Sequence, residues 1–410
     1  MNKFIAILLC CCFVVACTDD KKYAPKEGRI YVFDNPIPET TQGTSTLKQV
    51  SIQTQWPSKN FNNQNQLPNM KIEADNRFTW ETRVGKSTDL GSRLLPTPVA
   101  QDNFIYVLDG TYSLTKIDEN NGHVVWQKQL AENTKGVGLA LQDNTLFANS
   151  SDGMITAISA DGDLLWQKDL NVAVRSSIVA DKKALYLITT HNQLIVLSQK
   201  NGNEIWHYQT TKPNTFLQEM AAPALSNGIL VVPFSTGEVI AFDNNSGLLS
   251  WIQMMIGNRP KDLIEIPQIA AAPIIEGNTI YLTGNANLTG AYDLKTGASK
   301  WTNNYGSRIT PILGENALFL LTNQNILLAL DKKTGKVFWQ QPFDSKDYNP
   351  WQNLFVLNDQ LVLSDGAVIV FVDPSNGKTI KTQKQSIQAQ PIAVNGHLVT
   401  LDKKTNLTYK

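Results

Sequence analysis

The sequence predicts an all-β fold built from one repeated sheet, and three observations lead to this prediction. An eleven-residue phrase occurs as "AYDLKTGASKW" at 291–301 and again as "ALDKKTGKVFW" at 329–339. Related copies recur along the chain, with their final tryptophans 38 to 50 residues apart. The stretches between copies alternate β-branched, aromatic and polar residues, and no amphipathic helix period accompanies them. A β unit that recurs at this spacing is typical of a β-propeller.

The repeated phrase keeps a tryptophan in register through most of the chain. Whole or partial copies end at Trp80, Trp126, Trp166, Trp206, Trp251, Trp301 and Trp339. An eighth position, in "FVDPSNGKTIK", holds Lys381 instead. A large aromatic side chain at a fixed place on an outer strand buries about 200 Å² when it fills the gap between two sheets. We therefore expect these tryptophans to pack between neighbouring blades.

Each repeat contains four short strands. Between Trp166 and Trp206 these are "RSSIVA", "ALYLITT", "QLIVLSQ" and "EIWHYQ", separated by the turn residues "DKK", "HN" and "KNG". The phrase itself is a strand end, a tight turn and the start of the outer strand. An Asp in the turn accepts hydrogen bonds from nearby backbone amides, and Gly adopts the positive φ that the turn needs. The repeated Asp residues are therefore predicted to stabilise turns.

Counting the strands predicts eight four-stranded antiparallel blades. Triplets of inner strands begin near Leu95, Val137, Ser176, Ala221, Ala271, Ile309, Asn353 and Ala389. The last triplet has no outer strand after it, and the outer strand around Trp80 has no triplet before it. We expect these two to pair, which closes the ring and removes an exposed sheet edge.

The N-terminal segment "MNKFIAILLCCCFVVAC" is predicted to be a lipoprotein signal. Its apolar run is shorter than the roughly 20 residues that a membrane-spanning helix needs. It ends in "VVAC", which resembles the bacterial lipobox and implies cleavage before Cys17 with lipid on the Cys17 sulfur. The alternative is ordinary signal cleavage with a bystander cysteine. We thus predict a signal at 1–16, a lipidated and irregular tether at 17–75 and the propeller at 76–410.

Composition excludes several functional classes. The 36 basic residues balance the 36 acidic ones, without the basic patch expected of a nucleic-acid binder. The four cysteines all lie at 10–17, so the predicted mature chain has no disulfide partner. The four histidines fall on turns or strand edges without the spacing of metal ligands: His123, His191, His207 and His397. We expect no catalytic residue, no metal and no cofactor.

The phrase is similar to the quinoprotein-type propeller repeat, A-x-D-x-x-T-G-x-x-x-W. With the lipobox and eight blades, the chain resembles the BamB family of the outer-membrane β-barrel assembly machinery. This resemblance implies a non-enzymatic periplasmic scaffold, held on the outer membrane by its lipid. Such a scaffold binds the periplasmic domains of the barrel-inserting protein BamA and aids the delivery of unfolded outer-membrane proteins.

A periplasmic quinone-dependent dehydrogenase, or a propeller that binds a small molecule, is the alternative function. Enzymes of that class resemble one another in a vicinal cysteine pair at the cofactor and in a bound calcium. The adjacent cysteines of this chain, Cys10 to Cys12, lie in the predicted signal. This pattern favours the scaffold.

The two longest intervals, Trp206–Trp251 and Trp251–Trp301, contain insertions between an outer strand and the next inner strand. Exposed apolar residues in such connections mark partner surfaces, whereas buried ones would cap the ring. In the family that this chain resembles, a leucine–arginine motif precedes the corresponding inner strand, and here its positions hold Leu217 and Gln218. An acidic pair of the family is replaced by Gln268 and Ala270. Both replacements remove charge from the expected contact. The predicted partner residues are Phe216, Leu217, Gln218, Met220, Met255 and Leu263.

Overall fold

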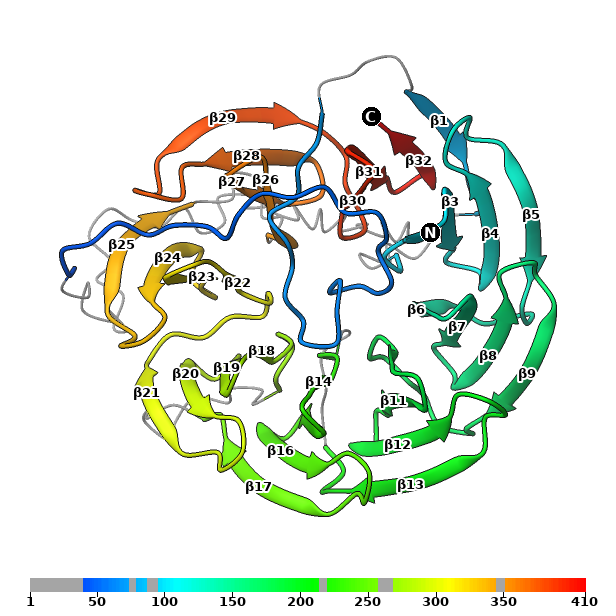
Figure 1. Cartoon of the computed structure of the whole chain (residues 1–410), viewed down its shortest axis with the longest axis horizontal. Coiled ribbons are helices and arrows are strands. Elements are labelled where there is room, and N and C mark those ends of the chain that lie inside the picture. Colours follow the sequence, from blue (N-terminus) through cyan, green and yellow to red (C-terminus); the bar gives the residue numbers. More distant parts are fainter. Residues whose placement is uncertain (1–39, 74–78, 87–94, 214–219, 257–267, 344–350) are drawn as a thin grey trace, which may run out of the picture. The chain divides into compact units, whose positions relative to one another are not determined.

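The computed structural model describes residues 40–73, 79–86, 95–213, 220–256, 268–343 and 351–410. Thirty-two strands form eight four-stranded antiparallel sheets, and these sheets are arranged as blades around a ring (Figure 1). Every described secondary-structure element is a strand, bridge, bend or turn. The predicted eight-bladed propeller is confirmed.

Blades 1–4 follow one another in chain order, each with its innermost strand first. Blade 1 is β2 (Val99–Gln101), β3 (Phe104–Leu108), β4 (Ser113–Asp118) and β5 (Val124–Gln129). Blade 2 is β6 (Gly136–Gln142), β7 (Thr145–Ser150), β8 (Met154–Ser159) and β9 (Leu164–Asp169). Blade 3 is β10 (Val179–Ala180), β11 (Ala184–Ile188), β12 (Gln193–Ser198) and β13 (Glu204–Gln209). Blade 4 is β14 (Ala224–Ser226), β15 (Ile229–Pro233), β16 (Glu238–Asp243) and β17 (Leu249–Met254).

Blades 5–8 complete the ring. Blade 5 is β18 (Ile274–Glu276), β19 (Thr279–Gly284), β20 (Leu288–Asp293) and β21 (Ser299–Asn303). Blade 6 is β22 (Ile312–Leu313), β23 (Ala317–Leu321), β24 (Ile326–Asp331) and β25 (Val337–Pro342). Blade 7 is β26 (Asn353–Leu357), β27 (Gln360–Ser364), β28 (Val368–Val372) and β29 (Thr379–Lys384). Blade 8 is β30 (Ile392–Val394), β31 (His397–Leu401), β32 (Asn406–Tyr409) and β1 (Trp80–Arg83).

Blade 8 joins the two ends of the strand sequence, as predicted. Its strand order is β1-β32-β31-β30, with β1 antiparallel to β32 from Trp80↔Tyr409 to Arg83↔Asn406. The Trp80 and Tyr409 rings stack with centroids 5.2 Å apart, and the Tyr409 hydroxyl donates to Glu119 Oε1 at 2.7 Å. Burial and the Glu119 carboxylate raise the pKa of Tyr409. The closing contact therefore ties blade 8 to blade 1.

The strands differ in burial with their distance from the ring axis. Inner strands such as β11, "ALYLI", are buried at every residue because a neighbouring blade covers each face of the sheet. The outer strand of the same blade, β13, exposes four of its six residues, and the other two, Trp206 and Tyr208, are half-buried. The apolar core is therefore divided among the spaces between blades.

A β-bulge recurs at one place in blades 1–7. In blade 6, Ala329 faces Trp339 and Leu330 faces Val337, which leaves Phe338 as an extra residue on the outer strand. The extra residues of the seven blades are Val125, Leu165, Ile205, Ser250, Lys300, Phe338 and Ile380. Such a bulge increases the local twist of the strand. Each bulge residue directly precedes the repeat tryptophan, or Lys381 in blade 7.

Each repeat tryptophan lies against the turn of the following blade. Each of the seven indoles lies close to one glycine in such a turn. In chain order from Trp80 to Trp339, these glycines are Gly122, Gly162, Gly202, Gly247, Gly297, Gly335 and Gly377. A Cβ built on Gly297 would lie 2.8 Å from the Trp251 ring. In six blades the indole N–H also donates to a carbonyl in that turn, at 2.7 to 3.4 Å. The tryptophan therefore bridges two blades through both its ring and its N–H.

An aspartate begins most of these turns. The Asp331 carboxylate accepts the backbone N–H groups of Lys333 at 2.9 Å and Thr334 at 2.8 Å. In blade 7 a hydrogen bond from the Ser375 hydroxyl lowers the pKa of Asp373, and burial opposes this shift. The repeated Asp residues thus stabilise turns, as the sequence indicates.

Residues 40–73, which we call the strap, belong to the segment predicted as an irregular tether. The strap forms only isolated bridges and turns, and it crosses the middle of the ring (Figure 1). Trp56 exchanges backbone hydrogen bonds with Ala100 at 2.7 and 2.9 Å, and the Trp56 side chain is completely buried. The Asn65 amide donates to the carbonyls of Pro223 and Pro273. The strap is therefore packed on the propeller.

Among the described residues, none forms a helix with the length and apolarity that a membrane crossing requires.

Candidate partner-binding face

The ring has two faces that the antiparallel chain path makes different. Turns from first to second strand and from third to fourth strand lie on one face. Turns from second to third strand, and the connections between blades, lie on the other. The strap contacts the first kind of turn: Asn395 N donates to Gln53 O and Glu73 N donates to Gly396 O, each at 2.7 Å. We call this the strap face and the opposite one the connection face.

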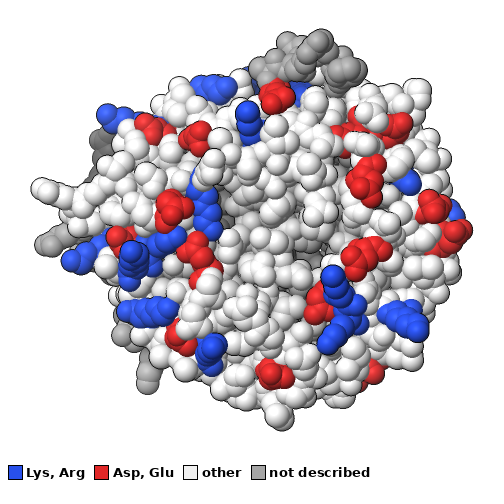
Figure 2. Space-filling view, in the orientation of Figure 1, with Lys and Arg blue, Asp and Glu red and all other residues white. Residues whose placement is uncertain are grey.

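The strap face is not a strongly charged surface. Figure 2 shows Lys and Arg mixed with Asp and Glu around the ring, with a central part that is largely uncharged. The charged groups there include Lys48 and Lys332, which flank Glu276 at 2.9 and 2.8 Å. Burial of the polar Asn-rich strap therefore relies on hydrogen bonds to backbone carbonyls more than on charge.

The two predicted insertions leave from neighbouring blades on the connection face. The first connects β13 to β14 and the second connects β17 to β18. Phe216, Leu217 and Gln218 of the first insertion, and Leu263 of the second, lie outside the described residues. The described residues show how each insertion joins the ring.

The start of the first insertion is fixed by polar contacts to turns of blades 3 and 4. The Thr210 hydroxyl donates to Glu238 Oε2 at 2.6 Å, and the Asn192 amide donates to Thr211 O at 3.0 Å. At its end, Met220 forms a parallel bridge with Ser176. These contacts hold both ends of the insertion on the connection face.

Met220 and Met255, which the sequence predicts as partner residues, are buried at 4% and 0% exposure. Met255 N donates to Gly237 O at 2.8 Å, and the Tyr292 hydroxyl lies 3.6 Å from Met255 Sδ. The two side chains therefore pack the core where the insertions join the ring. Gln268, one of the positions where charge was expected, is also buried.

The exposed apolar residues at the second insertion are different ones. Ile252, Met254 and Ile256 are each about half exposed, at 47%, 47% and 50%. Ile252 and Met254 lie two residues apart on β17, and successive side chains of a strand point to opposite sides, so these two share one side. Ile256 follows two residues after the end of the strand. The alternation along "WIQMMI" was the sequence signal that separates these residues from buried Met255. We call Ile252, Met254 and Ile256 the exposed row.

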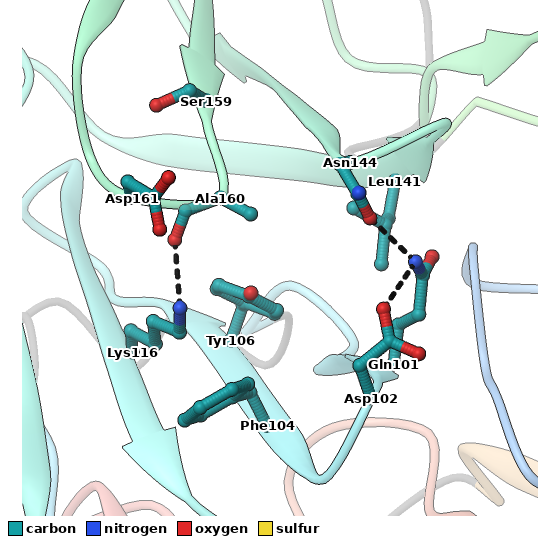
Figure 3. Close-up of a pocket in the computed structure, with 10 residues that line it drawn as sticks. All are labelled: Gln101, Asp102, Phe104, Tyr106, Lys116, Leu141, Asn144, Ser159, Ala160 and Asp161. Atoms are coloured by element: carbon teal, nitrogen blue, oxygen red, sulfur yellow. Dashed lines mark hydrogen bonds between the residues drawn. The ribbon is translucent and has the colours of Figure 1, made fainter.

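A second concave region lies between blades 1 and 2, with a volume of about 270 Å³. Lys116 extends across it, with its ammonium 3.9 Å from the Phe104 ring centroid and 2.9 Å from the Ala160 carbonyl oxygen (Figure 3). Gln101 on the other side donates to Asp102 and Asn144. Burial and nearby Asp102 raise the pKa of Tyr106 to about 12.

Lys116 stands where most copies of the repeat have alanine, as at Ala157, Ala241, Ala291 and Ala329. Lys116 is not among the residues predicted from the sequence, although this break in the repeat was a usable signal. Its ammonium is already engaged by a ring and a carbonyl. The region therefore joins blades 1 and 2 through the hydrogen bonds of Lys116 to Ala160 and of Gln101 to Asn144.

The described residues contain no group of three or more His, Cys, Asp or Glu side chains placed to share a metal ion. The four cysteines lie at positions 10–17, outside the described residues. Within the described ranges, no cluster of acidic side chains is therefore arranged to hold a calcium ion.

The fold and the bridging tryptophans define the class of protein first: an eight-bladed propeller of the quinoprotein type. The family model described as "Outer membrane protein assembly factor BamB" matches residues 111–341. The chain therefore belongs to the BamB family of outer membrane protein assembly factors, which confirms the resemblance seen in the sequence.

Individual relatives are distant in sequence. The BamB of Shewanella oneidensis is 25% identical over 245 residues, which are 56% of this chain and 61% of that protein. The BamB of Yersinia pestis is 25% identical over 255 residues, 59% of this chain and 64% of that protein. The matched part of the chain thus spans about six-tenths of the length of these relatives.

Solved structures match over more of the chain. The crystal structure of BamB from Moraxella catarrhalis has a TM-score of 0.68 at 18% identity, covering 80% of this chain and 99% of that one. The quinohemoprotein alcohol dehydrogenase of Comamonas testosteroni has a TM-score of 0.65 at 11% identity, covering 87% and 80%. At these identities both matches show the fold alone, so the dehydrogenase match carries no argument for enzyme activity.

Proposed function

We propose that this chain is a non-enzymatic scaffold in the assembly of outer-membrane β-barrel proteins. Membership of the BamB family is the observation that carries this proposal. The relatives named above are assembly factors of outer membrane proteins.

We further propose that the connection face binds the periplasmic domains of a BamA-like protein. The exposed row supports this because three apolar side chains, two residues apart, stand beside an insertion at the edge of the ring. Met220 ends the first insertion and Met255 begins the second, and both side chains are buried, so each insertion is fixed to the ring at that end. A binding loop on a rigid base loses less conformational entropy when its partner docks.

The lipid on Cys17 is proposed to hold the protein on the periplasmic side of the outer membrane. From Cys17 to Thr40 the chain can reach at most roughly 83 Å, at no more than about 3.6 Å per residue. Replacing Cys17 by Ala should move the protein from the membrane to the soluble fraction after cell lysis. Persistent membrane association of that variant would contradict the anchor.

The partner is tested by co-purification from detergent-solubilised envelopes. Leu217→Asp and Ile256→Asp should each reduce recovery of the BamA-like protein, because a buried unpaired charge opposes docking of an apolar surface. Ile52→Asp is the matched control, since Ile52 is an exposed apolar residue of the strap. Circular dichroism checks that all three variants fold. Equal recovery with all three variants would show that the partner binds elsewhere.

A further inference from the structure

Three consecutive blades expose apolar residues at the same place on their outer strands. We call Val124 and Val125 on β5, Leu164 and Leu165 on β9, and Ile205 on β13 the outer arc. Each is between 46% and 61% exposed. Single exposed apolar residues are ordinary on a protein surface, but neighbouring ones in structural register are not. The outer arc is separate from the exposed row and from both insertions.

Register relates the outer arc to the bulges described above. Val125, Leu165 and Ile205 are the bulge residues of blades 1–3, whereas blade 5 has Lys300 and blade 4 has Ser250 at this position. In blade 7 the bulge residue Ile380 is exposed but follows the polar Thr379. Blade 4 exposes Leu249, at 45%, directly before its bulge residue Ser250. Exposed apolar residues at both of these positions are therefore a property of blades 1 and 2.

Blade 6 shows what an outer strand can bind at this place. Its residues Val337 and Phe338 correspond to Val124 and Val125, and the strap covers them. Thr40 forms a parallel bridge with Val337, and Thr41 N donates to Val337 O at 2.8 Å. Val337 is only 3% exposed as a result. The chain thus contains an example of an extended segment bound to an outer strand.

The next strap residues complete the contact. A Cβ on Gly43 would lie 2.6 Å from the Phe338 ring, so only a residue without a side chain fits there. Ser45 is buried, and its hydroxyl accepts the Trp339 indole N–H at 2.7 Å and donates to Pro374 O at 2.5 Å. The segment therefore combines a backbone hydrogen bond, packing on the bulge residue and a hydroxyl at the blade junction.

We propose that β5 and β9 bind an extended peptide segment of another protein in the way that β25 binds residues 40–45. Each is the outermost strand of its sheet, so its outer edge has no paired strand among the described residues. Val125 and Leu165 are smaller than Phe338, which leaves room for a side chain where the strap needs Gly43.

The bound segment is one with an apolar residue at every second position, because alternate side chains of an added strand face the outer arc. Strands of outer-membrane barrels have this alternation. The proposal therefore rests on the proposed function, in which unfolded barrel proteins are the clients.

The test uses the full-length protein and a labelled twelve-residue peptide of alternating Val and Thr with terminal Lys residues. A photo-reactive phenylalanine analogue at position 165 should cross-link to this peptide at least about fivefold more than one at position 300, the same bulge position in blade 5. The double variant Leu164→Lys, Leu165→Lys should weaken peptide binding about tenfold, which corresponds to about 1.4 kcal/mol.

The matched control is Thr379→Lys, Ile380→Lys, which places the same charges at the same register of blade 7 and should leave peptide binding unchanged. A peptide with the same composition but clustered valines should bind weakly. Equal loss in both double variants, or equal cross-linking at positions 165 and 300, would overturn the proposal. A dimer that the Leu164→Lys, Leu165→Lys variant dissociates would assign the outer arc to self-association and also overturn it.

Failure of the proposed function has a different signature. If the BamA-like partner is absent from every pull-down while the alternating peptide still depends on Leu164 and Leu165, the inference stands and the assembly role falls. If the Leu164→Lys, Leu165→Lys variant loses the partner and the unmodified protein does not bind the peptide, the outer arc is a partner contact and the inference is wrong.

Discussion

Seven junctions between blades contain an indole, whereas the junction from blade 7 to blade 8 has Lys381 in its place. The reason lies in what each tryptophan contacts. Its ring covers the turn between the third and fourth strands of the next blade. In blade 8 those strands are β32 and β1, which are not consecutive in the chain, so no such turn joins them. The seven tryptophans therefore follow the seven turns and not the eight blades.

The comparison shows how a side chain can be conserved within a repeat for a reason outside its own blade. Trp339 of blade 6 still has a turn to cover, at Gly377. At the corresponding position of blade 7, Lys381 places its ammonium 4.2 Å from the Phe371 ring centroid of its own blade. All six residues of β29 are exposed, unlike the other outer strands that carry a repeat tryptophan in blades 1–6. The eighth junction is instead filled by aliphatic and phenylalanine side chains, since Val362 and Phe371 of blade 7 share one buried cluster with Ile392 and Leu407 of blade 8.

Removing one indole should have the largest effect. Trp251→Ala should lower the free energy of unfolding by about 3–5 kcal/mol, because a buried ring and its hydrogen bond to Leu294 O are lost. Urea denaturation followed by fluorescence or circular dichroism measures this. A loss below about 1 kcal/mol would mean that the indole does not hold the junction.

The glycine beneath the indole should matter next. Gly297→Ala should destabilise the protein by roughly 1–3 kcal/mol, since it adds strain at φ +71° and a Cβ 2.8 Å from the Trp251 ring. Gly277→Ala in the same blade is the control: its φ is +57° and its Cβ would meet nothing within 4 Å. Equal losses in thermal unfolding would show that the indole contact adds nothing to the backbone strain.

The turn aspartate should contribute less, and in a pH-dependent way. Asp373→Asn should cost roughly 0.5–1 kcal/mol at neutral pH, because the carboxylate accepts hydrogen bonds from Ser375 but is only partly shielded from water. A carboxyl whose folded-state pKa is lowered adds stability above its unfolded pKa and loses it as pH falls through the folded pKa.

The pKa of Asp373 is lowered. The difference in stability between the native protein and Asp373→Asn should therefore shrink as the pH falls below about 4, near the ordinary pKa of Asp. Denaturation curves at several pH values check this. A difference that grows toward acid pH would contradict the assigned hydrogen bonds.

Lys381 should have the smallest effect. Lys381→Ala should change stability by no more than about 0.5 kcal/mol, as expected for an exposed side chain. Lys381→Trp should bring no gain comparable to the loss in Trp251→Ala, because no turn lies beneath it. A stabilisation of several degrees in the melting temperature by Lys381→Trp would refute the explanation given for the missing eighth tryptophan.

The repeat made the fold predictable from the sequence. A fixed spacing of Trp, Asp and Gly gave the blade count, and the unpaired strand around Trp80 gave the ring closure with β32. Such features are local and repeated, so each copy supports the others. The single features were harder. The strap has no period, and its Asn65 finds the Pro223 and Pro273 carbonyls only through the folded ring.

The candidate site was predicted less well for a related reason. Its position beside two insertions follows from the spacing of Trp206, Trp251 and Trp301. Composition alone did not separate buried Met255 from exposed Met254, although strand alternation distinguishes them. Met220 is buried because the end of its insertion bridges Ser176, a contact between blades that no local pattern reveals.

Closure by β1 and β32 sets an order on the maturation of the protein. Among the described residues β1 is the first strand, and its partner β32 is the last, so β1 can pair only after the strands between them have left the channel. A chain emerging from an export channel with its N-terminus first would carry β1 unpaired throughout its passage. Deleting residues 406–410 removes β32, so β1 has no partner and the ring of sheets cannot close. The truncated chain should cross the membrane normally and then be degraded.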